Sequence, residues 1–393
     1  MKLTGILGSA SLAVLAMAGN AHAADKYVVG VSNTLIGNGW REEMICSIKA
    51  EAEASGKVSK VIVANRNGGP SEQIADIRNL ISAGANIIII NPSDREALNP
   101  VIKQAADKGI VVVAVDQAVS APEAYVLTND QVEYAKLGAK WLFDKLGGKG
   151  SVVEMRGIDG VPADADRHQG FTETAKNYPD IKVTSVFSGW ALDKTAQETK
   201  NLLASGKPID GVWTSGIDST VVDAYKTAGK PYVPVVGADN NGFIGQLIDQ
   251  KEKGLSGAAV SNPPAVGAAG LSLALDVLAK KEHPHLIKVT PTVWDNGEGL
   301  GQLIDQKEKG LSGAAVSNPP AVGAAGLSLA LDVLAKKEHP RLIKITPSVW
   351  DNGEGIDKLK AAYNPKLDPF FSVATVPPYT HYTPEQLISC KGP

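Results

Sequence analysis

Short runs of β-branched residues alternate with helical patterns along most of the chain, and this alternation restricts the fold more than any other feature. In the first part we expect strands at Tyr27–Ser32, Lys60–Ala64, Asn86–Ile90 and Ile110–Val115, and helices near Trp40–Ala54, Ser71–Ala83 and Glu96–Lys108. Gly84 and Gly109 stand where helices would stop. Continuous apolar strands joined by helices predict a parallel sheet covered on both faces.

The same alternation then begins again. Further strands are expected at Ser151–Met155, Lys182–Phe187, Gly211–Thr214 and Val233–Gly237, and helices near Gln131–Leu146, Arg167–Asn177, Thr195–Ala204, Ser219–Thr227 and Phe243–Lys253. The segment Ala118–Thr128 has few helix-forming residues and is interpreted as a crossover between two units. The predicted fold class is α/β, with two doubly wound parallel-sheet lobes, the first at 24–120 and the second at 121–262.

A block of 56 residues occurs twice in tandem, at 245–300 and 301–356. The copies differ at four positions, where His285, Val289, Thr292 and Leu300 become Arg341, Ile345, Ser348 and Ile356. Because solenoid folds need about three or more stacked repeats, we interpret one block as surplus. Each copy holds a helix (Gly245–Lys253 in the first), a strand (Leu255–Ser261), a break at Pro263-Pro264, a long helix (Ala265–Lys281) and a final strand (Leu286–Val293).

The duplication leaves two assignments open. The first lobe is completed either by 263–295 or by 319–351, and the near-identity of the copies leaves both possible. The sequence also does not show whether the duplication is natural or an assembly artefact. We expect that the chain folds without residues 301–356.

The N-terminus has the three parts of a secretory signal peptide at 1–23: Lys2, the apolar stretch Ile6–Ala18, and the cleavage signal Ala21-His22-Ala23. The apolar stretch is too short to span a membrane, so we expect an exported, soluble mature chain. The net charge is −3 and no basic stripe stands out, which argues against a nucleic-acid partner.

The chain has two cysteines, Cys46 and Cys390. Export permits a disulfide between them, which would join the C-terminal tail at 357–393 to the first helix. Two free buried thiols are the alternative.

Polar side chains follow the expected strands, where open parallel sheets bind their ligands. The first unit offers Ser32, Asn33, Asn65, Asn91, Asp116 and Gln117, and the second Arg156, Asp159, Ser215, Asp218 and Asp239 to Asn241. Amides, hydroxyls and a few carboxylates suit a ligand with many hydroxyl groups. The alternative is turn and helix-cap chemistry, which favours the same residue types. Trp40 and Trp190 are candidates to lie against the C–H face of a sugar, although core packing would be as ordinary.

Signals of catalysis are weak. The sequence holds no nucleophile elbow, phosphate loop, dinucleotide fingerprint or HExxH motif, and we expect no cofactor, no metal and no enzyme activity. The carboxylates are numerous, so a glycosidase-like pair stays as an alternative.

Five stretches carry a resemblance to a known family: GVSNTLIGNGWREE, NIIIINPSD, VVVAVDQA, VPADADRHQGF and VVGADNNG. They resemble the periplasmic sugar-binding proteins of ABC importers, of the ribose- and galactofuranose-binding type. The resemblance implies a type I periplasmic binding protein fold, two lobes joined by crossover hinge strands. It implies a ligand site made of Ser32, Asn38, Trp40, Arg41, Asn91, Asp116, Arg167 and Asp239, with Asp218 and Asn262 as weaker matches. Gln117 stands where the family has arginine, which leaves room for a polyol or an unusual pentose.

The resemblance further implies a periplasmic, monomeric protein that delivers a sugar or polyol to an ABC transporter permease, with a chemoreceptor as a second partner. Two rival interpretations are an exported carbohydrate-active enzyme and the effector domain of a sugar-sensing repressor. The repressor would need an N-terminal helix-turn-helix, and a signal peptide takes that place here.

Overall fold

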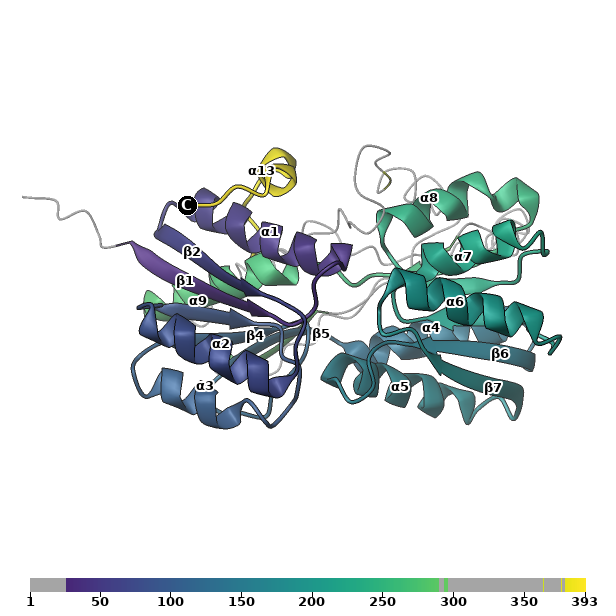
Figure 1. Cartoon of the computed structure of the whole chain (residues 1–393), viewed down its shortest axis with the longest axis horizontal. Helices are drawn as coiled ribbons and strands as arrows, with labels where there is room; N and C mark the ends of the chain where they lie inside the picture. The colour runs from purple at the N-terminus through teal and green to yellow at the C-terminus, as the bar shows by residue number, and fades with distance from the viewer. Residues whose placement is uncertain (1–25, 290–292, 296–362, 364–375, 377–378) are drawn as a thin grey trace, which may run out of the picture.

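The computed structural model describes residues 26–289, 293–295, 363, 376 and 379–393. These residues form two α/β lobes that lie side by side, each with helices on both faces of a sheet (Figure 1). The predicted signal peptide at 1–23 and the second copy of the repeat at 301–356 lie outside the described residues. Within the described part of the chain, no helix has the length and apolar character needed to cross a membrane.

The first lobe contains a six-stranded parallel sheet in the order β11-β5-β4-β3-β1-β2. Its strands are β1 (Tyr27–Asn33), β2 (Val58–Asn65), β3 (Ile87–Ile90), β4 (Val111–Val115), β5 (Tyr125–Asn129) and β11 (Leu286–Val289). Helices α1 (Gly39–Ser55) and α9 (Val266–Leu278) cover one face, and α2 (Pro70–Ser82) and α3 (Asn99–Ala106) cover the other. The four isoleucines of β3 are completely buried because both faces of this central strand are covered.

The second lobe repeats this plan in the order β12-β10-β9-β8-β6-β7. Its strands are β6 (Lys149–Arg156), β7 (Asp180–Phe187), β8 (Gly211–Thr214), β9 (Val235–Ala238), β10 (Gly257–Val260) and the antiparallel edge strand β12 (Val293–Asp295). Helices α4 (Gln131–Lys145) and α5 (Pro162–Ala175) cover one face, where aromatic side chains pack around Trp213. Helices α6 (Leu192–Ala204), α7 (Asp218–Thr227) and α8 (Asn241–Asp249) lie on the other face, and a short 3-10 helix spans Lys251–Lys253.

The structure corrects two details of the predicted elements. Tyr125–Asn129, interpreted as part of a crossover, forms strand β5 between β4 and β11, so the first lobe reaches Asn129 rather than residue 120. The final strand expected at Leu286–Val293 is divided: β11 joins the first sheet, whereas β12 joins the second. Strand pairing decides both cases, because β5 pairs with the distant strand β11, whereas β12 pairs with β10.

The first copy of the repeat contributes to both lobes. Its residues form most of α8, β10 and β12 in the second lobe, and α9 and β11 in the first lobe. Helix α9 packs closely on α1, since a Cβ added at Gly267 would lie 2.6 Å from the carbonyl oxygen of Met44. Both described sheets are therefore completed without any residue of 301–356.

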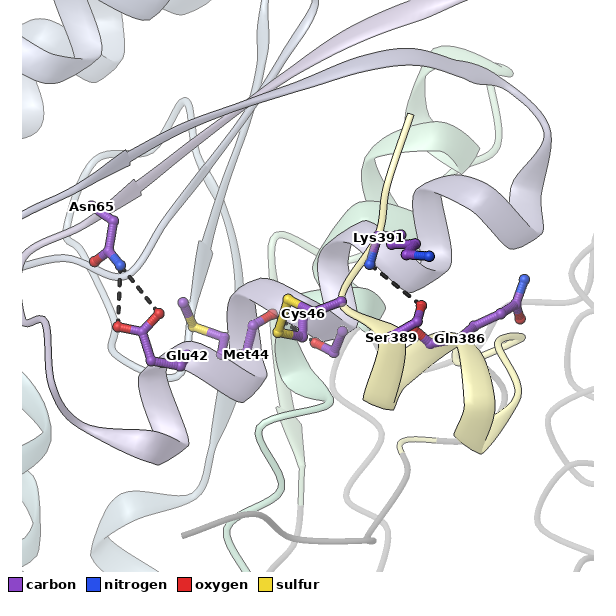
Figure 2. The surroundings of a disulfide bond; sticks show 9 residues. Glu42, Met44, Cys46, Asn65, Gln386, Ser389 and Lys391 are labelled. Atoms are coloured by element: carbon purple, nitrogen blue, oxygen red, sulfur yellow. Dashed lines mark hydrogen bonds between the residues drawn. A yellow bond between two sulfur atoms is a disulfide. The ribbon is translucent and has the colours of Figure 1, made fainter. Parts of the chain in front are cut away.

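The C-terminal end of the chain returns to the first lobe. A disulfide joins Cys46 of α1 to Cys390, the residue after α13 (Pro384–Ser389), across 344 residues of sequence (Figure 2). The backbone N–H and Nδ1 of His381 both bond the buried Glu51 carboxylate at 2.8 Å. These contacts hold the described residues 379–393 against α1.

Candidate functional site

The carboxyl ends of both sheets meet at a small hollow between the two lobes. The hollow has a volume of about 40 Å³, room for a few water molecules. Its lining combines charged, amide and aromatic side chains with small residues: Asn38, Trp40, Arg41, Asp116, Ala163, Arg167, Trp190, Ser215, Gly216, Ala238, Asn240 and Asn262. This is the place where doubly wound sheets bind ligands.

The start of α1 brings three side chains to the hollow from the first lobe. Asn38 is the N-cap: its side-chain oxygen accepts from the Arg41 N–H, while its amide nitrogen donates across the gap to the Trp190 carbonyl at 3.2 Å. The Trp40 indole N–H donates to the carbonyl of Asn262 at 2.7 Å, on the segment that passes from β10 to α9. The loop before the helix and the cap therefore orient the Gly-Trp-Arg sequence toward the second lobe.

Arg41 is only 5% exposed and makes a single side-chain hydrogen bond with the described residues, from Nη1 to Asn33 Oδ1 at 3.2 Å. Burial lowers its pKa to about 10, opposed by the nearby Asp116 carboxylate and supported by the positive charge of Arg167. The side chain is still protonated at neutral pH. Its remaining side-chain N–H groups have no partner among the described residues and can donate to a ligand.

Asp116 follows β4 and has a left-handed backbone, with φ of 65°. Its carboxylate accepts from Gln131 Nε2 at 2.9 Å and from Asn91 Nδ2 at 3.3 Å. A carboxylate offers about four lone-pair positions, so two remain for a ligand. Strain at a non-glycine residue of this kind is common at binding sites.

The second lobe presents Arg167 and Trp190. Arg167 of α5 donates from Nε to Gln131 Oε1 at 2.8 Å and from Nη1 to the Ser215 carbonyl at 2.9 Å, and its guanidinium lies 4.3 Å above the Tyr134 ring. The Trp190 indole donates to the same Ser215 carbonyl at 2.9 Å. These contacts fix both side chains at the hollow's second wall.

Comparison with known proteins agrees with this arrangement. Residues 29–282 match the model of the periplasmic binding protein domain. The chain belongs to the periplasmic binding protein family. The xylitol-binding protein of Mycolicibacterium smegmatis is 31% identical over 256 residues, which cover 63% of this chain and 72% of that protein. The ribose import binding protein of Bacillus subtilis is 26% identical over 260 residues, covering 65% and 83%.

A solved structure is similar as well. An ABC transporter solute binding protein from Thermobispora bispora aligns with a TM-score of 0.64 and 32% identity, over 68% of this chain and 84% of that one. The two-lobe, parallel-sheet architecture is thus that of a type I periplasmic binding protein.

Of the candidates named from strand ends alone, Asn33, Asn65, Arg156, Asp159 and Asn241 do not line the hollow of this periplasmic binding protein. Five residues that the family resemblance singled out also lie behind the hollow rather than on its wall. Ser32 and Asn91 are completely buried below it, each in contact with Gln73. Gln117 bonds Asn91 on one side and the backbone of Ala163 on the other. The remaining two are the second-lobe carboxylates Asp218 and Asp239.

Asp218 accepts from the hydroxyl of Thr214, the backbone N–H of Ala238 at 3.0 Å and the amide of Asn240, so its oxygens hold strand ends together. Burial raises its pKa, while these hydrogen bonds act in the opposite direction. Gly237 leaves the space for it, since an added Cβ there would lie 1.9 Å from Asp218 Oδ1. Asp239 accepts from the Asn262 N–H at 2.8 Å and thereby orients a hollow-lining residue.

Sequence reasoning missed Gln131 and Asn129 as site residues. Gln131 contacts Asp116 and Arg167, and Asn129 donates to Asn262 Oδ1 at 3.0 Å. Both lie next to the crossover after β5. Recognising that strand would have placed Asn129 at a strand end, where the other candidates were sought. Within the described part of the chain, no group of His, Cys, Asp and Glu side chains is arranged to hold a metal ion.

Proposed function

We propose that this chain is an exported solute-binding protein that captures a sugar or polyol between its lobes and delivers it to an ABC transporter permease. One observation carries the proposal: hydrogen-bonding groups that the described residues leave unused converge on one hollow. The Nη2 groups of Arg41 and Arg167 and the Nδ2 group of Asn262 have no partner among the described residues. With the open lone pairs of Asp116, they match the acceptors and donors of neighbouring hydroxyl groups.

The charges around the hollow favour a neutral ligand. Arg41 and Arg167 bring two positive charges to the wall and Asp116 brings a negative one, while the carboxyl groups of Asp218 and Asp239 lie directly behind it, so no excess positive charge is left for an anionic ligand to neutralise. Trp40 and Trp190 add apolar ring surface on both sides. A sugar ring or an extended polyol needs polar side chains for its hydroxyl groups and flat apolar side chains for its C–H faces, and the hollow offers both.

Binding requires the lobes to separate, since a hollow of about 40 Å³ holds only a few waters. The chain crosses between the lobes after β5 and after β10, and these two described segments give a hinge. The consecutive strands β11 and β12 also belong to different sheets. A ligand that contacts both walls shifts the population toward the closed form. Export through a signal peptide at 1–23, a periplasmic location and a monomeric state are part of the proposal, and a chemoreceptor is a second candidate partner.

A thermal-shift screen of the mature chain against pentoses, hexoses and pentitols tests the proposal. We expect one of these compounds to raise the melting temperature in a concentration-dependent manner, because it binds only the folded state. In an Asp116→Asn variant, the ligand concentration that gives the same rise in melting temperature should be at least tenfold higher, since a charge-assisted hydrogen bond contributes about 1.5–3 kcal/mol. A complete panel without any shift would contradict the proposal.

The same compounds distinguish a receptor from an enzyme. The relatives found are solute-binding proteins, and we propose that this chain has no catalytic activity. Stoichiometric binding by calorimetry with the sugar recovered unchanged supports the receptor. Formation of a product by the wild-type chain, absent in an Asp116→Asn variant, would favour the carbohydrate-active enzyme instead.

A further inference from the structure

Two buried glutamines join the lobes beside the hollow without lining it. Gln117 belongs to the first lobe and Gln131 opens α4 in the second, and they are 1% and 3% exposed. Neither side chain belongs to the wall of the hollow. Each amide bonds one partner in its own lobe and one partner in the other lobe.

Gln117 uses its amide as a cap for a helix of the opposite lobe. Its Oε1 accepts from the backbone N–H of Ala163 at 2.9 Å, and its Nε2 donates to Asn91 Oδ1 at 2.8 Å. Ala163 lies in the first turn of α5, where Val161 is the N-cap residue and provides no side-chain cap. The N–H groups of a first helical turn have no partner within their helix, so an acceptor from the other lobe satisfies one of them.

An arginine at position 117 could not make the same contact. A guanidinium has donors only and would meet the donor end of α5 with a positive charge, which the helix dipole disfavours. The amide oxygen of Gln117 therefore supplies the acceptor that this contact between the lobes needs.

Gln131 makes the complementary connection. Its Nε2 donates to the Asp116 carboxylate of the first lobe at 2.9 Å, and its Oε1 accepts from Arg167 Nε of the second lobe at 2.8 Å. Asp116 and Arg167 both line the hollow. One amide thus orients a ligand-facing carboxylate and a ligand-facing guanidinium together, and only when the lobes are closed.

We propose that Gln117 and Gln131 are positioning residues that stabilise the closed arrangement and set affinity without contacting the ligand. Opening the cleft breaks the Ala163–Gln117 and Gln131–Asp116 bonds, so each glutamine contributes to the closed-to-open ratio. This inference rests on the proposed function only for its effect on affinity, because closure itself can be measured without a ligand.

Cross-linking at the cleft mouth provides that measurement. Arg95 and Asp166 form an ion pair of 2.7 Å between the lobes, and their side chains are 39% and 28% exposed. Arg95→Cys and Asp166→Cys in one chain, joined by a short bifunctional maleimide, report the closed fraction through the cross-linking rate. The native disulfide stays oxidised throughout.

In this background we expect Gln117→Met and Gln131→Met each to slow cross-linking about fivefold to tenfold, the factor that one buried hydrogen bond provides. Gln169→Met is the matched control, since Gln169 is exposed and its side chain bonds, among the residues that the structure describes, only Glu173 of the same helix. Where a methionine variant fails to fold, Gln117→Asn and Gln131→Asn keep the amide but shorten its reach. Unchanged cross-linking rates in folded variants would overturn the inference.

Affinity provides the second readout. For any sugar found in the thermal-shift screen, the dissociation constant of each methionine variant should increase by the same factor by which its cross-linking rate falls. This factor should be the same for every ligand that binds. A change in selectivity between ligands would show that the glutamines touch the ligand and would overturn the assignment. If no sugar binds, the proposed function fails while the cross-linking result still stands.

Discussion

At the scale of single residues, Arg41 shows how burial and charge together define a binding group. The side chain is nearly enclosed, close to Asp116, and within the field of a second guanidinium, that of Arg167. Arginine tolerates this environment because its ordinary pKa is so high that a reduction to about 10 still leaves it charged at neutral pH. Lysine, with a lower ordinary pKa, would respond differently.

We therefore predict that Arg41→Lys makes ligand affinity depend on pH. Burial and repulsion by Arg167 lower the pKa of a cation at this place, so a lysine would be charged at low pH and neutral as pH rises. Affinity should fall about tenfold or more, since the fork geometry is lost, and should decline further between roughly pH 7 and pH 9. Calorimetric titrations at several pH values measure this, with the exposed Arg78→Lys as control. A flat profile in Arg41→Lys would contradict the prediction.

At the scale of elements, the packing of α9 depends on its close approach to α1. Gly267 faces the backbone and side chain of Met44 and also Ile48, with no room for a larger residue. The same glycine occurs at position 323 of the second copy. The chain thereby contains its own matched control for any substitution in the repeat.

We predict that Gly267→Leu destabilises the protein by about 3 kcal/mol or more, because overpacking forces α9 away from α1. Gly323→Leu should leave the melting temperature unchanged, since the described lobes are completed by the first copy. Thermal unfolding of both variants and of the double variant provides the comparison. If both single variants keep the wild-type melting temperature and the double variant is unfolded, the two copies can replace each other in the fold.

The C-terminal element depends on a covalent link to α1. Helix α13 has six residues and none is buried, so its own packing contributes little. We expect Cys390→Ser to lower stability by about 2–4 kcal/mol, as is usual when a disulfide is removed from an exported protein. Wild type with a reductant should unfold at the same temperature as the variant without it. A reductant effect on the variant itself would point to a cause other than this disulfide.

At the scale of the whole molecule, removal of the surplus block at 301–356 changes only the length of the connection between Asp295 and Tyr363. Between Asp295 and Tyr363 the chain has 67 residues, and deletion of 301–356 leaves 11. Both lobes keep every described element in that variant.

We predict that the deletion variant folds, binds the same ligand and is more stable by about 1–2 kcal/mol, because a shorter connection costs less closure entropy. Circular dichroism, thermal unfolding and the sugar panel measure the three properties. Loss of cooperative unfolding in this variant would show that the second copy contributes to the fold.

The strand-and-helix pattern was predictable because it depends on local residue order. β8 has the predicted bounds Gly211–Thr214, and Gly84 and Gly109 take the positive φ expected at helix ends. Strand β5 was missed since Pro122 and the small residues around it look like a loop, and only pairing with β4 and β11 makes the segment a strand.

The sequence by itself determined the α/β class, the two lobes and the collection of polar residues at strand ends, because periodicity and strand-end chemistry are local. Only the tertiary structure decided which of these residues reach the hollow and which support it from behind. The deciding contacts join distant residues, such as Asn38 with Trp190, Gln117 with Ala163 and Cys46 with Cys390, at separations of 152, 46 and 344. No local pattern encodes such pairings, since residues so far apart in the sequence meet only in the folded chain.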